Sequence, residues 1–263
     1  SQPRTTHSCI HASLSSAGSG ASVSTPHSNP QATELATLHT SSSSSQPMET
    51  QACMQAISSS VGPPIISSPP GSPETRPVIS IIDGTKDKTI IICPGNHDGV
   101  RLAEPQPKLH EDYAEELYKM ENVIMTTNPA YVNVGRTKKF SGIDILMYHG
   151  WSLVYYANKV PTLLKAGGVE NISHVMKYLL QRRHLSPFHK ANQKVINSEY
   201  DPMIIRKIPD IFVTGHVHKC SIQSYRNVTL LCGSAWEDLT EMNEKFGFVP
   251  EPCRLPLINL KTR

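Results

Sequence analysis

The chain has 263 residues, which suits one or two domains, and its formal net charge of +3 is compatible with a phosphate-rich partner without requiring one. Its six cysteines are scattered without C-x-x-C spacing, which excludes a zinc finger and a disulfide framework. The sequence has neither a signal-peptide pattern nor an apolar run long enough to cross a membrane, so we predict a soluble, cytoplasmic protein without membrane contact.

The first 77 residues are rich in Ser, Thr, Pro, Gln and Ala, and their apolar residues follow neither the strand nor the helix period. Between residues 1 and 75 the charged side chains are Arg4, Glu34, Glu49 and Glu74. Such a composition buries too little apolar surface to offset its chain entropy. We therefore predict that residues 1–77 form a disordered tail, which is either a flexible tether or a segment foreign to the folded domain.

From residue 78 onward, apolar residues recur with the periods of regular secondary structure. The β-branched run at 89–93 predicts a buried strand, which the following Pro-Gly pair ends. The same patterns predict a short apolar strand at 78–82, a helix at 109–120, strands at 123–126 and 130–134, and a hairpin partner at 143–147. The first part of the domain is thus mainly strands, with one helix.

The second part of the domain continues the mixture of helices and strands. Residues 152–165 have no clear pattern, whereas 171–183 place apolar residues on one face and predict an amphipathic helix. Strands are expected at 208–213 and 255–260, and a hairpin at 222–225 and 228–232 turns at Arg226-Asn227. Together these elements predict an α/β layered domain over residues 78–263.

Three of the expected strands end in a glycine next to side chains that bind metals. The motifs are G-N-H-D at 95–98, H-G at 149–150 and G-H-V-H at 215–218. Imidazole, amide and carboxylate groups suit Zn, Mn or Fe, and two such ions side by side hydrolyse phosphoesters. In an extended segment, residues two apart project to the same side, so we expect His216 and His218 to reach two adjacent ions. Each motif alone also fits a capped loop or a core histidine.

The three motifs in this order resemble the second half of the calcineurin-like metallophosphoesterase signature. Longer stretches are similar to a narrower family, the small subunit of archaeal family-D DNA polymerase. They are P-G-N-H-D-G-V-R-L-A-E-P-Q-P at 94–107, N-P-A at 128–130, Y-H-G at 148–150, R-R-H-L-S-P at 182–187, P-D-I-F-V-T-G-H-V-H at 209–218 and W-x-x-x-T at 236–240. The resemblance covers residues 78–263 and implies a calcineurin-like layered sheet with flanking helices.

The resemblance also implies a function, which is 3′–5′ exonuclease proofreading of DNA with two divalent metal ions. Manganese is the expected ion, with magnesium or zinc as alternatives. Carried over position by position, Asn96, His149 and His216 are expected to bind one ion, and His218 the other. His97 is expected to hydrogen-bond the scissile phosphate.

The same resemblance implies roles for three further residues. Asp98 is expected to orient His97. Arg101 either contacts a DNA phosphate or forms a structural ion pair. Arg183 and its neighbours at 182–184 either line the DNA path or cover the domain surface. The family further implies a heterodimer with a large catalytic polymerase subunit.

The chain departs from the family pattern in its first half. The motifs D-x-H and G-D-x-x-D, which supply the bridging carboxylate and the other ligands of the second ion, are absent from the sequence. We therefore expect an exonuclease domain without its opening strands, in a truncated or mis-joined chain whose second metal site is incomplete and whose activity is low. The alternatives are a non-catalytic scaffold subunit of a polymerase and a metallophosphodiesterase of another substrate.

Overall fold

The computed structural model describes residues 11–15, 21–24, 35–40, 51–56, 88–186, 194–196, 199–235, 239, 241–245 and 247–261. Its strands are β1 His11–Ser15, β2 Ala21–Ser24, β3 Leu35–Thr40, β4 Gln51–Ala56, β5 Lys88–Ile92, β6 Ala103–Glu104, β7 Val123–Met125, β8 Ala130–Arg136, β9 Ile143–Tyr148, β10 Lys194–Val195, β11 Ile211–Thr214, β12 Ser221–Tyr225, β13 Val228–Cys232 and β14 Leu257–Asn259. Its helices are α2 Glu111–Tyr118, α3 Leu153–Lys159, α4 Pro161–Lys165, the 3₁₀ helix η1 Gly168–Asn171, α5 Ile172–Arg182 and α6 Glu241–Lys245.

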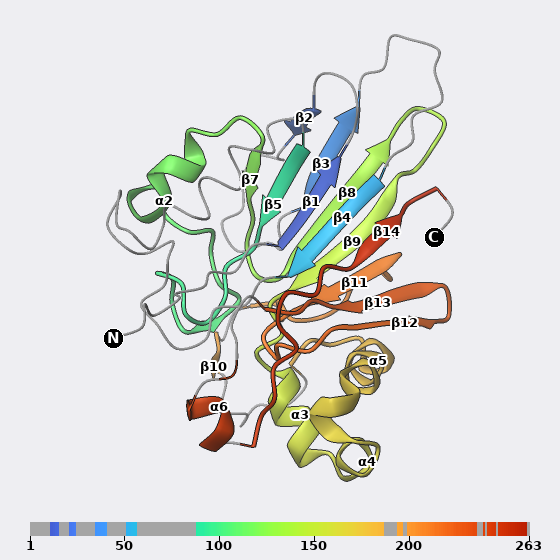
Figure 1. Cartoon of the computed structure of the whole chain (residues 1–263). Coiled ribbons are helices and arrows are strands. Elements are labelled where there is room, and N and C mark those ends of the chain that lie inside the picture. Colours follow the sequence, from blue (N-terminus) through green and yellow to red (C-terminus); the bar gives the residue numbers. More distant parts are fainter. Residues whose placement is uncertain are drawn as a thin grey trace.

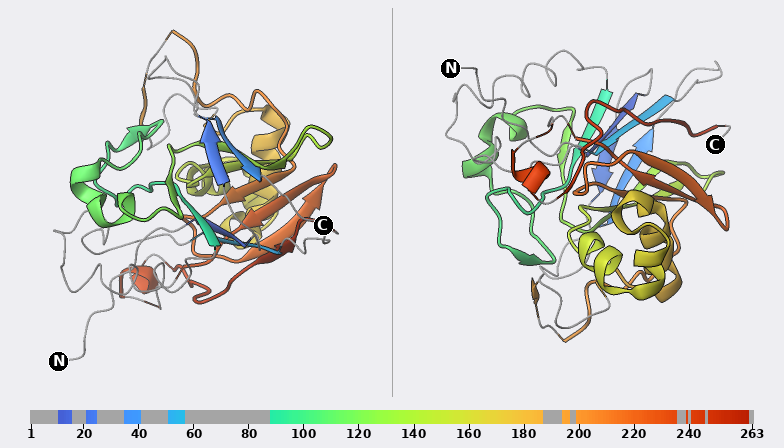
Figure 2. Two further views of the ribbon diagram at one scale, coloured as in Figure 1. Left: turned by 90° about the horizontal axis from the view of Figure 1, so that it is seen from above. Right: turned by 60° about the horizontal axis from the view of Figure 1, so that its bottom comes forward.

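Most of the strands form two sheets that lie face to face (Figures 1 and 2). The larger sheet has the strand order β12-β13-β11-β9-β8-β3-β2, and the smaller sheet has the order β14-β4-β1-β5-β7. Helices α3, α4 and α5 lie together beside the larger sheet, while α2 lies on the other side of the molecule (Figure 1). The chain is therefore a mixed α/β protein, as the sequence predicts.

Successive side chains along a strand point to opposite faces of the sheet, and the buried ones pack into three hydrophobic clusters. In β11, Phe212 packs with the helices α3 and α5, whereas its neighbours Ile211 and Val213 pack between the two sheets. In β5, Ile91 points between the sheets, and Ile90 and Ile92 pack with α2. The resulting order of layers is helix, sheet, sheet, helix. Strands β5, β9 and β11 are thus buried on both faces, which explains their continuous apolar sequences.

Several predicted elements are confirmed with shifted ends. The expected strand at 208–213 begins only at Ile211, because Pro209 has no N–H to donate to a ladder. The helix expected at 109–120 begins at Glu111, since the side chain of His110 caps it by accepting from the N–H of Asp112 at 3.3 Å. Residues 152–165 form the two short helices α3 and α4, which meet at Val160 before a proline.

The region before residue 78 contains more regular structure than expected. Strand β3 pairs in parallel with β8, and β1 pairs antiparallel with β5, so strands from this region continue both sheets. An open sheet edge presents unpaired N–H and C=O groups, and the backbone of a Ser-rich segment can pair with them. The remainder of 1–77 and the strand predicted at 78–82 lie outside the described residues. The domain boundary at 77 therefore stays a prediction.

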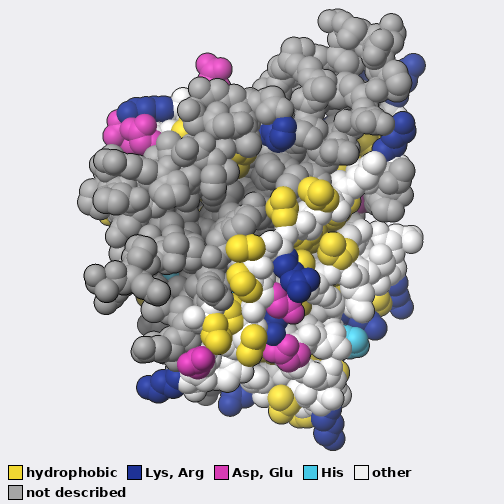
Figure 3. All heavy atoms as spheres, in the orientation of Figure 1, with side chains coloured by type: hydrophobic (Ala, Val, Ile, Leu, Met, Phe, Trp, Pro, Cys, Tyr) yellow, Lys and Arg dark blue, Asp and Glu magenta, His cyan; other side chains and the backbone are white. Residues whose placement is uncertain are grey.

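Apolar side chains are exposed along the C-terminal segment. Val249, Leu255 and Leu257 are 60%, 43% and 67% exposed, and Figure 3 shows hydrophobic side chains in a band across this face of the molecule. Among the described residues, none of the helices combines the length and the apolar character that spanning a bilayer requires.

Candidate metal centre

The three motif loops meet at one edge of the molecule because of how their strands pair. Strands β9 and β11 are parallel neighbours, and Tyr148 is in register with Thr214, so the residues that follow each of them come out side by side. The N–H of Gly215 donates to the carbonyl of His149 at 3.0 Å and ties the two loops together. The structure thus confirms the prediction that these loops lie at the carboxyl ends of buried strands.

Three of the predicted ligands converge on one point. The Nε2 of His149 lies 2.8 Å from the Oδ1 of Asn96 and 3.1 Å from the Nδ1 of His216. Adjacent ligands of a single ion lie about 3 Å apart when each is about 2.1 Å from the metal. The side chains of Asn96, His149 and His216, here called the NHH cluster, therefore have the spacing and chemistry of a partial ligand set for one divalent ion.

The electrostatics of the cluster favour neutral imidazoles. Burial, with smaller contributions from His218 and His97 nearby, lowers the pKa of His216 to about 3. Burial also lowers the pKa of His97 below its ordinary value of 6.5. A metal ion binds the neutral form of imidazole, so His216 would not need to lose a proton near neutral pH in order to bind one.

The loop after β11 is not extended, and this part of the prediction is wrong. His216 and His218 have φ angles of 67° and 49°, in the left-handed region that non-glycine residues seldom occupy. The chain turns at both positions, and so the alternation of an extended strand does not apply to their side chains. Such strained backbone is common at functional sites, where the surrounding structure holds it in place.

His218 is buried close to His216 but belongs to a different environment. Its ring packs edge to face against Phe248, with the centroids 5.8 Å apart, and its carbonyl accepts from the N–H of Glu251. Among the described residues, no three His, Cys, Asp or Glu side chains come together as they would to hold a metal ion. The second ion site therefore stays a prediction.

The loop at 95–98 is closed by its own aspartate. Asp98 is buried and its Oδ2 accepts from the N–H of Gly95 at 2.6 Å, while burial raises its pKa to about 7. Within the described part of the chain, no hydrogen bond joins Asp98 to His97. The observed contact of Asp98 therefore shapes the loop that carries Asn96 rather than holding the imidazole of His97.

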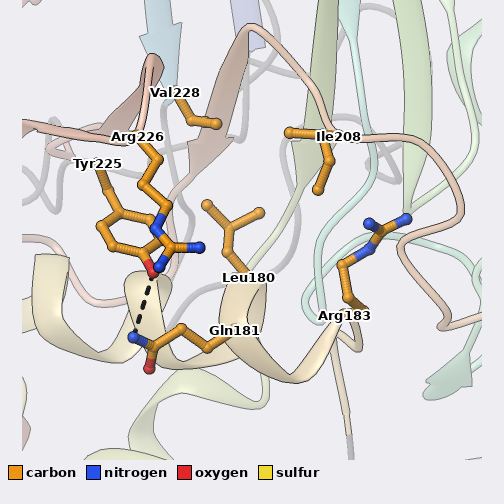
Figure 4. A pocket seen from close by; sticks show the side chains of 7 residues that line it. All are labelled: Leu180, Gln181, Arg183, Ile208, Tyr225, Arg226 and Val228. Atoms are coloured by element: carbon orange, nitrogen blue, oxygen red, sulfur yellow. Dashed lines mark hydrogen bonds between the residues drawn. The ribbon is translucent and has the colours of Figure 1, made fainter.

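Arg101 and Arg183, the two arginines predicted to contact DNA, lie in different parts of the structure. Arg101 is exposed and its Nε donates to the carbonyl of Pro105 at 2.8 Å, so it makes a backbone contact rather than an ion pair. Arg183 donates from Nε to the carbonyl of Ile205 at 2.7 Å. It lines a pocket of about 520 Å³ together with Leu180, Gln181, Ile208, Tyr225, Arg226 and Val228, and Figure 4 shows it across the pocket from Tyr225.

This pocket is remote from the NHH cluster. Ile208 precedes β11 and Val228 begins β13, which is parallel to β11, so the pocket lies at the amino ends of these strands, whereas His216 follows the carboxyl end of β11. The structure therefore does not bring Arg183 to the predicted metal site.

Comparison with known proteins identifies the family. The family model that describes the B subunit of DNA polymerase alpha/epsilon matches residues 74–223. The chain belongs to this family. A DNA polymerase II small subunit of Thermoplasma acidophilum is 35% identical over 70% of the chain and 35% of its own length. Those of Methanothermobacter thermautotrophicus and Pyrococcus furiosus are 32% and 31% identical, each over 67% of the chain and over 35% and 27% of their own lengths.

The resemblance to the small subunit of archaeal family-D polymerase is thereby confirmed. The chain spans about a third of the length of the curated relatives that it matches.

In this member of the polymerase family, a set of buried polar residues lies behind the cluster, and the sequence alone gives them no role in the site. Asn128 accepts the N–H of His149 at 2.8 Å, and Gln106 donates to the carbonyl of Gly95 at 3.0 Å. Glu104 is fully buried beside them. These residues belong to the N-P-A and E-P-Q-P stretches. In both stretches a polar residue stands next to a proline, and this pattern is the sequence signal that could have identified them.

Proposed function

We propose that this chain is the small subunit of a DNA polymerase and that it supplies part of a metal-dependent 3′–5′ exonuclease site. The observation that carries the proposal is the convergence of Asn96 Oδ1, His149 Nε2 and His216 Nδ1 from the ends of three separate segments. The order of layers, helix–sheet–sheet–helix, supports a calcineurin-like phosphoesterase fold. The family name of the relatives supports a role in DNA synthesis.

The roles of the residues follow from their chemistry. The NHH cluster would hold one divalent ion, for which manganese is the best candidate, and His218 would contribute to the neighbouring one. Bound ions of this kind neutralise phosphate charge and activate water for phosphodiester hydrolysis. His97, which is half-buried beside the cluster, would hydrogen-bond the scissile phosphate. Asp98 keeps the loop of both Asn96 and His97 closed.

The partners that we propose for this chain are DNA and a large polymerising subunit. The relatives are named small subunits, and that name implies a larger one. Single-stranded 3′ ends are the substrate that a proofreading site requires. Co-purification with the large subunit would test the first partner, and fluorescence anisotropy with labelled single-stranded DNA would test the second.

Manganese binding tests the site directly. We expect the purified full chain to bind Mn²⁺ and His149→Ala to raise the Kd at least about 100-fold, because His149 contacts both other members of the cluster. Titration calorimetry or electron paramagnetic resonance of free Mn²⁺ measures this. The control is His110→Asn, which removes an exposed imidazole while leaving a residue that caps α2. Equal Kd values for the wild type and His149→Ala would refute the proposed site.

A non-catalytic scaffold is the second candidate, and one observation favours it. The sequence lacks D-x-H and G-D-x-x-D, so the carboxylate that would bridge two ions is not supplied by those motifs. If the chain supplies one ion site of an incomplete exonuclease centre, as we propose, we expect it to bind Mn²⁺ but to degrade 3′-labelled single-stranded DNA no faster than the His149→Ala variant does. Absence of Mn²⁺ binding would favour the scaffold. Rapid degradation that His149→Ala abolishes would show that the chain already holds a complete two-ion site.

A further inference from the structure

Two buried carboxamides connect the loops that carry Asn96 and His149. The Nε2 of Gln106 donates to the carbonyl of Gly95 at 3.0 Å, and its Oε1 accepts from the Nδ2 of Asn128 at 2.7 Å. The Oδ1 of Asn128 accepts in turn from the N–H of His149 at 2.8 Å. Because Gly95 directly precedes Asn96, a continuous path of hydrogen bonds joins two of the three members of the NHH cluster from behind.

The backbone groups at the ends of this path determine the orientation of both amides. The N–H of His149 can only donate, so the Oδ1 of Asn128 must face it and the Nδ2 must face Gln106. The carbonyls of Gly95 and Arg101 can only accept, so the Nε2 of Gln106 must face them. Reversing either amide would break hydrogen bonds at both ends, and the path therefore has one arrangement.

The two residues are also fixed by their own surroundings. Gln106 and Asn128 are 1% and 0% exposed, and their backbones pair with each other through hydrogen bonds of 2.7 and 3.0 Å. The Oε1 of buried Glu104 accepts from the Nδ2 of Asn128 at 3.2 Å. Every amide atom of Gln106 and Asn128 thus has a partner, and a fully satisfied buried network is rigid.

We propose that Gln106 and Asn128 are positioning residues that set the distance between the Asn96 loop and the His149 loop. The inference rests on the proposed metal site. The side chains of Gln106 and Asn128 hydrogen-bond to backbone groups at Gly95 and His149, so their effect reaches an ion through the placement of the ligands. The E-P-Q-P and N-P-A stretches accordingly serve the metal site from within the core.

The test uses Gln106→Met in the full chain, because methionine keeps the length of glutamine and removes its hydrogen bonds. We expect the Kd for Mn²⁺ to rise about 10–100-fold, the usual effect of removing a residue that orients metal ligands. We also expect the visible absorption of bound Co²⁺ to change, since it reports the geometry of the ligands. A loss of stability alone would leave that spectrum unchanged at a temperature at which the variant is folded.

The matched control is Asn133→Leu. Asn133 is a buried amide with 0% exposure, and it donates to Asp144 Oδ1 at 2.9 Å at the start of β9, the end away from the cluster. We expect a comparable drop in thermal stability but an unchanged Kd and Co²⁺ spectrum. If Gln106→Met binds both ions as the wild type does while His149→Ala does not, the positioning role is wrong and the site is right. If the wild type and His149→Ala bind equally, the proposed function itself is wrong.

Discussion

Replacing Gly150 by alanine is expected to lower the free energy of unfolding by about 3 kcal/mol. Backbone strain and overpacking each contribute about 1–3 kcal/mol to this loss. Gly150 has a φ of +103°, where an L-residue is strained. A β-carbon there would lie 2.8 Å from the Cδ1 of Leu153 and 3.1 Å from the carbonyl oxygen of Gly215. Leu153 is fully buried and Gly215 belongs to the loop of His216, so neither neighbour can move without disturbing the core or the site.

The consequence for the metal site is separable from the loss of stability. An alanine at 150 pushes the Gly215 loop away from the His149 loop, and we expect Mn²⁺ affinity to fall as well. Urea denaturation measures the first effect and calorimetry the second. The control is Gly247→Ala, at a φ of +64° with nothing within 4 Å of an added β-carbon, which should cost only about 1 kcal/mol. Equal stability losses for the two variants would show that the contacts of the added β-carbon with Leu153 and Gly215 are unimportant.

The sequence predicts most of the fold because its strands have strong local signals. Arg226 and Asn227 adopt φ angles of 46° and 65°, as a two-residue hairpin turn requires, and the predicted hairpin forms between β12 and β13. The ends of elements are less predictable, as Pro209 and the capping by His110 show. The pairing of β1 and β3 with the two sheets had no signal at all, because it depends on open edges elsewhere in the chain.

The candidate site is predictable only in its outline. The parallel pairing of β9 and β11 is enough to bring His149 next to Gly215, and the glycine at each strand end marks the loops. The directions of His216 and His218 depend on left-handed backbone at both residues, which no local pattern signals. The location of Arg183 depends on how α5 packs against the sheet, and sequence spacing contains no such information.

Replacing Glu104 by glutamine is expected to make stability less dependent on pH. Burial raises the pKa of Glu104 from its ordinary 4.5 to about 8, while hydrogen bonds from Tyr148 and Asn128 oppose the shift. The folded chain therefore keeps a proton that the unfolded chain has already released between these two pH values. The stabilisation is full below pH 4.5 and is lost as the pH rises toward 8.

The glutamine variant isolates this contribution because it cannot ionise. Its Oε1 can still accept from the Nδ2 of Asn128, and its Nε2 can donate to the hydroxyl oxygen of Tyr148, which reverses the hydrogen bond to Tyr148 but keeps both contacts. Relative to the wild type, Glu104→Gln should gain about 3 kcal/mol in free energy of unfolding between pH 5 and pH 8, since one pKa unit corresponds to about 1.4 kcal/mol. Urea denaturation of metal-free protein at several pH values measures the difference.

Glu121→Gln provides the comparison, because it removes the same charge at an exposed position. Its difference from the wild type should stay nearly constant over the same pH range. A constant difference for Glu104→Gln as well would mean that Glu104 is ionised in the folded chain throughout. In that case the side chain of Asn128 would donate to a full negative charge, and the support behind His149 would be charge-assisted rather than neutral.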